Sequence, residues 1–132
     1  MSGTLARLKR RADFLSVAAA RRKWVAPGLI VQARRRAAGQ QADRERRGKT
    51  ATDAARARVG FTVSRKVGSA VARNRVRRRL KAALASLEPD RVDGGMDVVV
   101  IGRSETLKRS FPDLIGDLTQ AFKRLGVWKE NQ

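Results

Sequence analysis

Two hydrophobic periodicities meet between Arg58 and Leu87 of this 132-residue chain, and they restrict its fold more than any other feature. From Arg58 to Ser64 apolar residues alternate with polar residues or glycine, which predicts a strand with one apolar and one polar face. From Ala70 to Leu87 apolar residues recur at spacings of three and four, which predicts an amphipathic helix. A strand followed directly by a helix points to a protein that packs helices on a sheet.

The other segments extend this pattern to both ends of the chain. A helix is predicted over Leu5–Ala20, followed by extended chain over Trp24–Arg34 that is broken at Pro27-Gly28. The β-branched run in Asp97–Gly102 predicts a strand buried on both faces, and a last helix runs from about Pro112 to Leu125. The order α-β-β-β-α-β-α predicts an α/β protein, an α+β-like small sandwich with one mixed sheet and three main helices.

Length and one biased segment set the domain organisation. A chain of 132 residues fits a single domain, here 1–132. Residues 35–57 contain no large apolar side chain and cannot bury enough surface to offset their ordering entropy. We therefore expect one domain with a mobile basic loop at 35–57.

Charge is distributed very unevenly along the chain. Lys and Arg number 31 against 12 Asp and Glu, for a net charge of +19. Residues 1–81 hold 24 basic and 4 acidic residues, whereas residues 82–132 hold 7 and 8. A one-signed segment repels itself until a counter-charge arrives, so a polyanionic partner is expected.

Composition excludes several kinds of site. The chain has no Cys and no His, so it has no disulfide, no thiol nucleophile and no His-based catalysis or metal binding. The carboxylates are scattered along the sequence, which argues against a metal or acid–base site made by the protein. No apolar run approaches the roughly 20 residues that span a bilayer, and no signal-peptide pattern is present. A cytoplasmic protein is the expectation, with a nucleic acid or an anionic membrane surface as the partner that its charge would attract.

A dense basic stripe lies on the predicted second helix. Six basic residues fall between Arg73 and Lys81, and no acidic residue occurs between Asp53 and Glu88. A charge run on a helix is commonly a solvated face, but here no acids are available for i,i+4 pairs. Arg side chains bind phosphate through two parallel hydrogen bonds. Nucleic-acid binding is therefore favoured over a solvated face, and charge alone does not choose between RNA and DNA.

The stretch VGFTVSRKVGSAVARNRVRRRLKAAL, residues 59–84, resembles the characteristic segment of the bacterial ribonuclease P protein subunit, including the Arg73-Asn74-Arg75 element. Two flanking segments, Arg11–Phe14 and Asp97–Ile101, are similar to the family's first-helix motif and last strand. The resemblance covers about three-quarters of the chain. It implies a single RNA-binding domain with a left-handed β-α-β crossover, which general rules of chain topology would not predict.

The resemblance also implies two binding surfaces. The surface for the catalytic RNA subunit comprises Arg65, Lys66, Arg73, Asn74, Arg75, Arg78 and Arg79. The cleft for the 5′ leader of precursor tRNA is lined by Phe14, Val17, Ile30, Arg58, Thr62, Arg73, Asn74 and Arg77. The family often has further aromatics at the positions of Ala18 and Gln32, so charge is expected to matter more than stacking here.

The implied function is that of an endoribonuclease subunit that promotes removal of the tRNA 5′ leader. The resemblance implies that the RNA carries the phosphodiester hydrolysis and holds the magnesium, while the protein alone binds no metal. It also implies one protein per RNA, with no DNA and no membrane among the partners. The alternative is a structural RNA-binding protein of ribosomal-protein type. For two residues the sequence pattern alone favours a structural role. It predicts that Phe14 is a core aromatic, and that Gly60 is a strand position that another backbone approaches closely.

Overall fold

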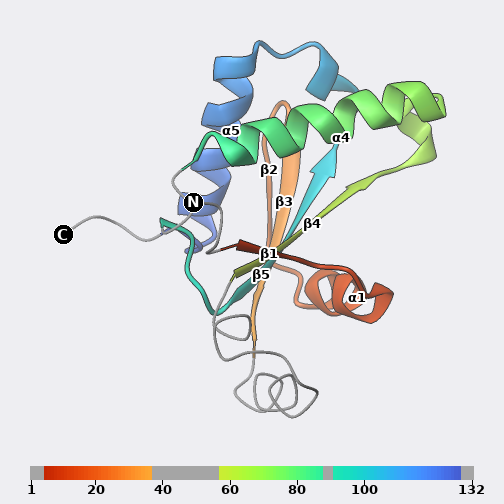
Figure 1. The fold of residues 1–132 in the computed structure, drawn as a ribbon. Helices are drawn as coiled ribbons and strands as arrows, with labels where there is room; N and C mark the ends of the chain where they lie inside the picture. The colour runs from red at the N-terminus through yellow and green to blue at the C-terminus, as the bar shows by residue number, and fades with distance from the viewer. Residues whose placement is uncertain (1–4, 37–56, 88–90, 129–132) are drawn as a thin grey trace.

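The computed structural model describes residues 5–36, 57–87 and 91–128. In chain order its elements are β1 (Leu5–Arg7), α1 (Arg11–Ala19), β2 (Lys23–Val25), β3 (Leu29–Arg35), β4 (Ala57–Val63), the 3-10 turn η1 (Arg65–Val67), α4 (Ala70–Ala85), β5 (Met96–Gly102), the 3-10 turn η3 (Ser104–Leu107) and α5 (Phe111–Arg124). The predicted fold class is confirmed: three α-helices pack on one mixed sheet, in the predicted order, with one additional strand at the start (Figure 1).

The strands form a five-stranded sheet in the order β1-β4-β5-β3-β2. Strands β1, β4 and β5 run parallel to one another, whereas β3 is antiparallel to both β5 and β2. The two long parallel strands β4 and β5 are neighbours, and the chain passes from one to the other through α4. Parallel neighbours need such a crossover.

Helices cover both faces of the sheet. On β5, Val98 and Val100 pack in the larger core beneath α4 and α5, while Val99 packs in the smaller core with Val17 of α1. All three valines are nearly inaccessible to solvent, so the predicted burial of this strand on both faces is confirmed. The sheet is therefore the middle layer, with α4 and α5 on one side and α1 on the other.

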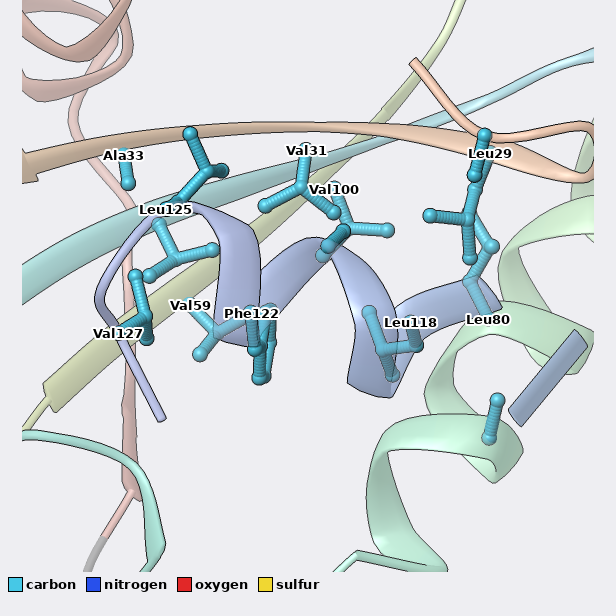
Figure 2. Packing of buried hydrophobic residues seen from close by; sticks show 14 of the residues in the cluster. Leu29, Val31, Ala33, Val59, Leu80, Val100, Leu118, Phe122, Leu125 and Val127 are labelled. Atoms are coloured by element: carbon cyan, nitrogen blue, oxygen red, sulfur yellow. The ribbon is translucent and has the colours of Figure 1, made fainter. Parts of the chain in front are cut away.

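The larger core is built mainly by α5 against the sheet. Leu114, Leu118 and Phe122 are spaced for one helical face and are fully buried. Figure 2 shows Leu118 and Phe122 of α5 packed against the strands. The Ser110 hydroxyl accepts a hydrogen bond from the Asp113 N–H, which caps the helix at its start. Asp113 in the first turn and the basic residues Lys123 and Arg124 in the last turn complement the helix dipole.

The N-terminal segment differs from the single helix predicted over Leu5–Ala20. Residues Leu5–Arg7 instead form β1, which pairs in parallel with Ala57–Val59, and the helix begins only at Arg11. The Leu8 N–H extends this pairing by donating to the carbonyl of Val59 at 3.1 Å. Strand pairing with a distant segment has overridden the local three-and-four spacing, which a sequence pattern alone cannot reveal.

The loop predicted at 35–57 also changes at its ends. Arg35 is the last residue of β3, Arg36 is buried, and Ala57 is the first residue of β4. The rest of that prediction, residues 37–56, lies outside the described residues.

Candidate nucleic-acid interface

Helix α4 separates an apolar face from a basic one. Its buried side chains are Val76, Leu80 and Ala83, which pack into the larger core. The Ser69 hydroxyl caps the helix by accepting a hydrogen bond from the Ala72 N–H at 3.2 Å. The helix itself contains no acidic residue, so its outward cations have no i,i+4 partners on α4. This face therefore presents a dense positive field.

The seven residues predicted to face the catalytic RNA are gathered on η1 and α4. Five of them are exposed: Arg65, Lys66, Asn74, Arg75 and Arg78. Arg73 and Arg79 are half-buried. The Arg79 guanidinium also donates a hydrogen bond to the backbone carbonyl of Arg109, which ties α4 to the segment before α5. Its role is therefore partly structural.

A pocket of about 330 Å³ lies between α1, β4 and α4, and is called here the α1–α4 pocket. Its apolar lining consists of Leu8, Phe14, Val59, Gly60 and Phe61. Its basic lining consists of Arg7, Lys9, Arg77 and Lys81. No acidic side chain lines it within the described part of the chain. Apolar and aromatic walls beneath a ring of cations suit a ligand with an aromatic base and a phosphate.

Gly60 makes room for one wall of this pocket. A Cβ atom placed on Gly60 would lie 2.5 Å from Cζ of Phe14, so the ring rests directly on the backbone of β4. The close approach predicted at Gly60 is therefore present, but a side chain makes it rather than another backbone. Phe14 is half-buried, packs into the smaller core and also lines the pocket.

The eight residues predicted for the leader cleft do not all line one cavity. Phe14 and Arg77 line the α1–α4 pocket. Val17 is fully buried beneath α1 and Arg58 is 6% exposed, so neither offers a side chain to a ligand. The remaining four lie outside the pocket lining: Ile30, Thr62, Arg73 and Asn74. Asn74 is coupled to the pocket, since its Oδ1 accepts a hydrogen bond from Nη1 of Arg77 at 3.0 Å.

Sequence reasoning missed several residues of the pocket. Arg7 and Lys9 enter it because β1 pairs with β4, and a continuous N-terminal helix would have placed them elsewhere. Phe61 packs against the larger core and also lines the pocket. Lys81 belongs to the basic stripe of α4, and that stripe was the one available signal for it.

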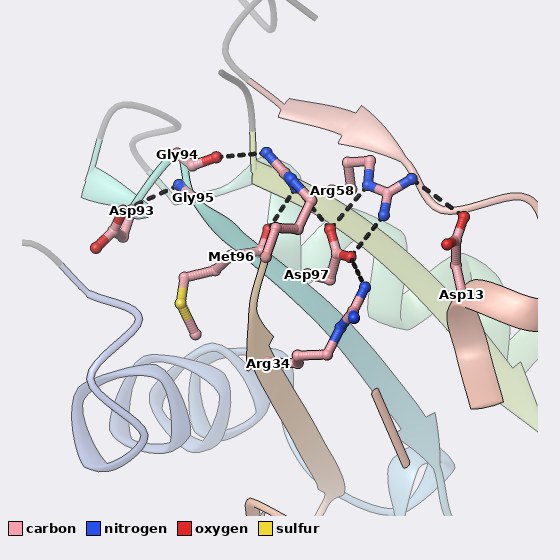
Figure 3. A network of polar contacts seen from close by, with 9 residues as sticks. Asp13, Arg34, Arg58, Asp93, Gly94, Gly95, Met96 and Asp97 are labelled. Atoms are coloured by element: carbon pink, nitrogen blue, oxygen red, sulfur yellow. Dashed lines mark hydrogen bonds and ion pairs between the residues drawn. The ribbon is translucent and has the colours of Figure 1, made fainter. Parts of the chain in front are cut away.

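A buried ion cluster lies beside the pocket, on the α1 side of the sheet. The Asp97 carboxylate accepts hydrogen bonds from Nε and Nη2 of Arg58 at 2.8 and 2.5 Å. It also accepts one from Arg36 at 2.6 Å and one from Arg34 at 3.0 Å (Figure 3). The third nitrogen of Arg58, Nη1, donates to Asp13 on α1 at 3.1 Å. One carboxylate thus joins β3, β4 and β5, and Arg58 extends the contact to α1.

Electrostatics keep this cluster ionised. Burial by itself would raise the pKa of Asp97, but hydrogen bonds and charge from Arg58 and Arg36 hold that pKa below its ordinary value of 3.8. Burial would likewise lower the pKa of Arg58, but the hydrogen bonds and charge of Asp97, with a contribution from Asp13, raise it.

The described residues contain no group of three or more acidic, His or Cys side chains placed to hold a metal ion. None of the described helices is long and apolar enough to cross a bilayer.

These features define a class of protein: a small α/β sandwich that carries a basic helix beside a cation-lined pocket. A family model described as Ribonuclease P matches residues 3–126. A ribonuclease P protein component from Paramagnetospirillum magneticum is 53% identical over 127 residues, covering 96% of this chain and 87% of that protein. The chain belongs to the ribonuclease P protein family.

Solved structures support the fold. The RNase P protein of Staphylococcus aureus superposes with a TM-score of 0.69 at 20% identity, covering 93% of this chain and 97% of that one. The RNase P protein of Thermotoga maritima gives a TM-score of 0.66 at 25% identity, covering 89% and 96% respectively. The mixed sheet and its three helices are thus an architecture shared with these proteins.

Proposed function

We propose that this chain is the protein subunit of ribonuclease P, which binds a catalytic RNA and the 5′ leader of precursor tRNA and so promotes magnesium-dependent removal of the leader. The observation that carries this proposal is family membership over nearly the whole chain. The basic face of α4 and the α1–α4 pocket supply two surfaces suited to two RNA ligands.

The catalytic RNA is assigned to η1 and the exposed face of α4. Arg75 and Arg78 are exposed there, and no acid on α4 neutralises them. Guanidinium groups bind phosphate oxygens in a bidentate manner, and phosphate contacts dominate the affinity of such interfaces. Arg65 and Lys66 extend the same surface along the turn that precedes the helix.

The leader is assigned to the α1–α4 pocket. Its volume lies at the lower end of the roughly 300–1,000 Å³ typical of ligand pockets, which suits one nucleoside unit. Phe14 and Phe61 offer aromatic surface to a base, while Arg77 and Lys81 offer charge to the phosphates. Val17 and Arg58 are left out of this contact set because they are buried.

Chemistry is assigned to the RNA. Phosphodiester hydrolysis needs an activated water and neutralisation of developing negative charge, usually by metal ions. Arg and Lys can neutralise charge but do not act readily as bases near neutral pH. RNA phosphates can hold magnesium directly, so the protein's contribution is to lower repulsion between two RNAs and to position the substrate. We place the complex in the cytoplasm, with one protein per RNA.

A structural RNA binder of ribosomal type is the competing function. It shares the size and charge of this chain but has no need for an apolar pocket ringed by cations. Copurified RNA separates the two: a single RNA species supports the ribonuclease P subunit, whereas whole ribosomal RNA supports the alternative.

The direct test separates the two surfaces in a reconstituted complex. Arg75→Ala with Arg78→Ala should weaken assembly with the catalytic RNA and leave the dependence of substrate affinity on leader length intact. Phe14→Ala should leave assembly intact and weaken binding of precursor tRNA, but not of leaderless tRNA. Exchange of these two outcomes would show that the surfaces are assigned the wrong way round, and no effect from either variant would refute both assignments.

A further inference from the structure

The first turn of α1 contacts the sheet through two neighbouring side chains, Asp13 and Phe14. The helix has nine residues, and Val17 is its one fully buried side chain. Its N-cap residue, Arg10, makes no side-chain capping hydrogen bond. The first turn reaches the sheet through Asp13, which binds Arg58, and through Phe14, which rests on Gly60.

Both contacts fall on the same face of one strand. Arg58 and Gly60 are two residues apart on β4, so their Cβ directions point to the same side of the sheet. Asp97 lies opposite Arg58 on β5, and its carboxylate accepts hydrogen bonds from two of the three guanidinium nitrogens. The third nitrogen is thereby aimed at Asp13.

Arg58 is poorly placed to bind an external phosphate. All three of its nitrogens are engaged by Asp97 and Asp13, and its side chain is 7% exposed. A planar guanidinium that holds two carboxylates at once fixes both distance and angle between them, which the point charge of a lysine cannot do. The contacts from Asp97 through Arg58 to Asp13 therefore fix the position of α1 relative to the sheet.

We propose that Arg58 is a positioning residue of the α1–α4 pocket: held by Asp97, it binds Asp13 and so fixes the first turn of α1 where the Phe14 ring forms the pocket wall. The proposal deepens the function above and rests on it, because the pocket is taken there as the leader site. Arg58 acts through α1 and does not touch RNA.

The test is made at Asp13, since changes at Arg58 would also disturb the buried Asp97. Asp13→Ala removes the α1 end of the contact, and Asp13→Glu restores a carboxylate. Asp113→Ala is the matched control: Asp113 is an exposed acidic residue in the first turn of α5, 3.9 Å from Arg109. It removes the same charge and the same favourable interaction with a helix N-terminus.

Two readouts are taken on the full chain. The first is the ratio of affinities for precursor tRNA and leaderless tRNA in the reconstituted complex. Asp13→Ala should lower this ratio about fivefold or more, the lower end of what the loss of one base stack costs. Asp13→Glu should recover most of it, and Asp113→Ala should leave it unchanged.

The second readout needs no RNA. With 4-fluorophenylalanine at the four Phe positions, the fluorine resonance of Phe14, assigned by its loss in Phe14→Leu, should shift in Asp13→Ala. The resonance of the core residue Phe122 should stay in place. An unmoved Phe14 resonance would overturn the positioning role.

Phe14→Ala distinguishes failure of this proposal from failure of the function. A lower affinity ratio in Phe14→Ala, combined with an unchanged ratio in Asp13→Ala, overturns the positioning role and leaves the leader site standing. An unchanged affinity ratio in Phe14→Ala would show that the leader does not bind in the pocket. The fluorine resonance of Phe14 in Asp13→Ala would then be the test of the positioning role: a shift supports it and no shift overturns it.

Discussion

Asp97 is the residue whose loss should affect the fold most. Its side chain is fully buried and holds three guanidinium groups. Replacing it by Asn would remove the counter-charge that these three cations share, and breaking a buried pair from one side costs about 3–5 kcal/mol. Urea denaturation should show that loss in Asp97→Asn. Asp93→Asn, which disrupts a far more exposed pair with Arg35, should cost about 1 kcal/mol or less. Equal losses would contradict the assignment.

The same residue links stability to pH. Because the pKa of Asp97 is lowered in the folded state, its ion pairs contribute full stability above the carboxyl's ordinary value of 3.8. That contribution is lost as pH falls through the lowered folded-state pKa. The free energy of unfolding should therefore fall more steeply below pH 4 in the parent chain than in Asp97→Asn. Parallel acid profiles would show that other carboxylates account for the loss.

Gly60 gives a second test at single-residue scale. A methyl group there would meet the Phe14 ring and lie 3.0 Å from Cβ of Leu8, so α1 or the ring must move. Gly60→Ala should cost about 1–3 kcal/mol in unfolding experiments and weaken leader-dependent affinity. Gly116 has nothing within 4 Å of a built Cβ and lies in α5, so Gly116→Ala should be neutral or stabilising by up to about 1 kcal/mol. The reverse ranking would be inconsistent with this packing.

At the scale of elements, α4 carries two surfaces, a buried apolar face and an exposed basic face. Val76 and Leu80 anchor it in the core, and the opposite side carries the exposed cations Arg75 and Arg78. Affinity for phosphates falls with salt, with a logarithmic slope of about −0.7 to −0.9 per contact. Arg75→Ala with Arg78→Ala should therefore flatten the salt dependence of catalytic-RNA binding by about one to two units of slope. Lys123→Ala with Arg124→Ala removes equal charge from α5 and should leave the slope unchanged.

Most elements were predictable from local pattern, and the pocket was not. The alternation before Ser64 and the stripe through Val76 and Leu80 are properties of contiguous sequence, so β4 and α4 were predicted to within two residues. β1 was missed because its stability comes from pairing with β4, some fifty residues away. Arg7 and Lys9 reach the pocket only through that pairing, and the burial of Arg58 depends on Asp97 from another strand. Such long-range contacts leave no local periodicity to read.

At the scale of the whole molecule, the sheet separates two hydrophobic cores, and the pocket is lined by residues from both sides. The larger core beneath α4 and α5 fixes the basic helix from behind. The smaller core around Leu8, Val17 and Val99 fixes α1 on the other face. The α1–α4 pocket lies where these two layers meet at β4. In the proposed function, these adjacent surfaces bring two RNA ligands together.

The most direct test of a protein that positions RNA without performing chemistry is single-turnover cleavage of precursor tRNA across a magnesium titration. The catalytic RNA alone should cleave at high magnesium, because the metal screens the same phosphate repulsion that the protein lowers, and the protein alone should never cleave. Variants such as Ser64→Ala, Arg73→Ala and Phe14→Ala should raise the magnesium requirement and still cleave at saturating RNA, substrate and magnesium. A folded, RNA-bound variant that abolished cleavage under those conditions would contradict this mechanism and identify a catalytic residue in the protein.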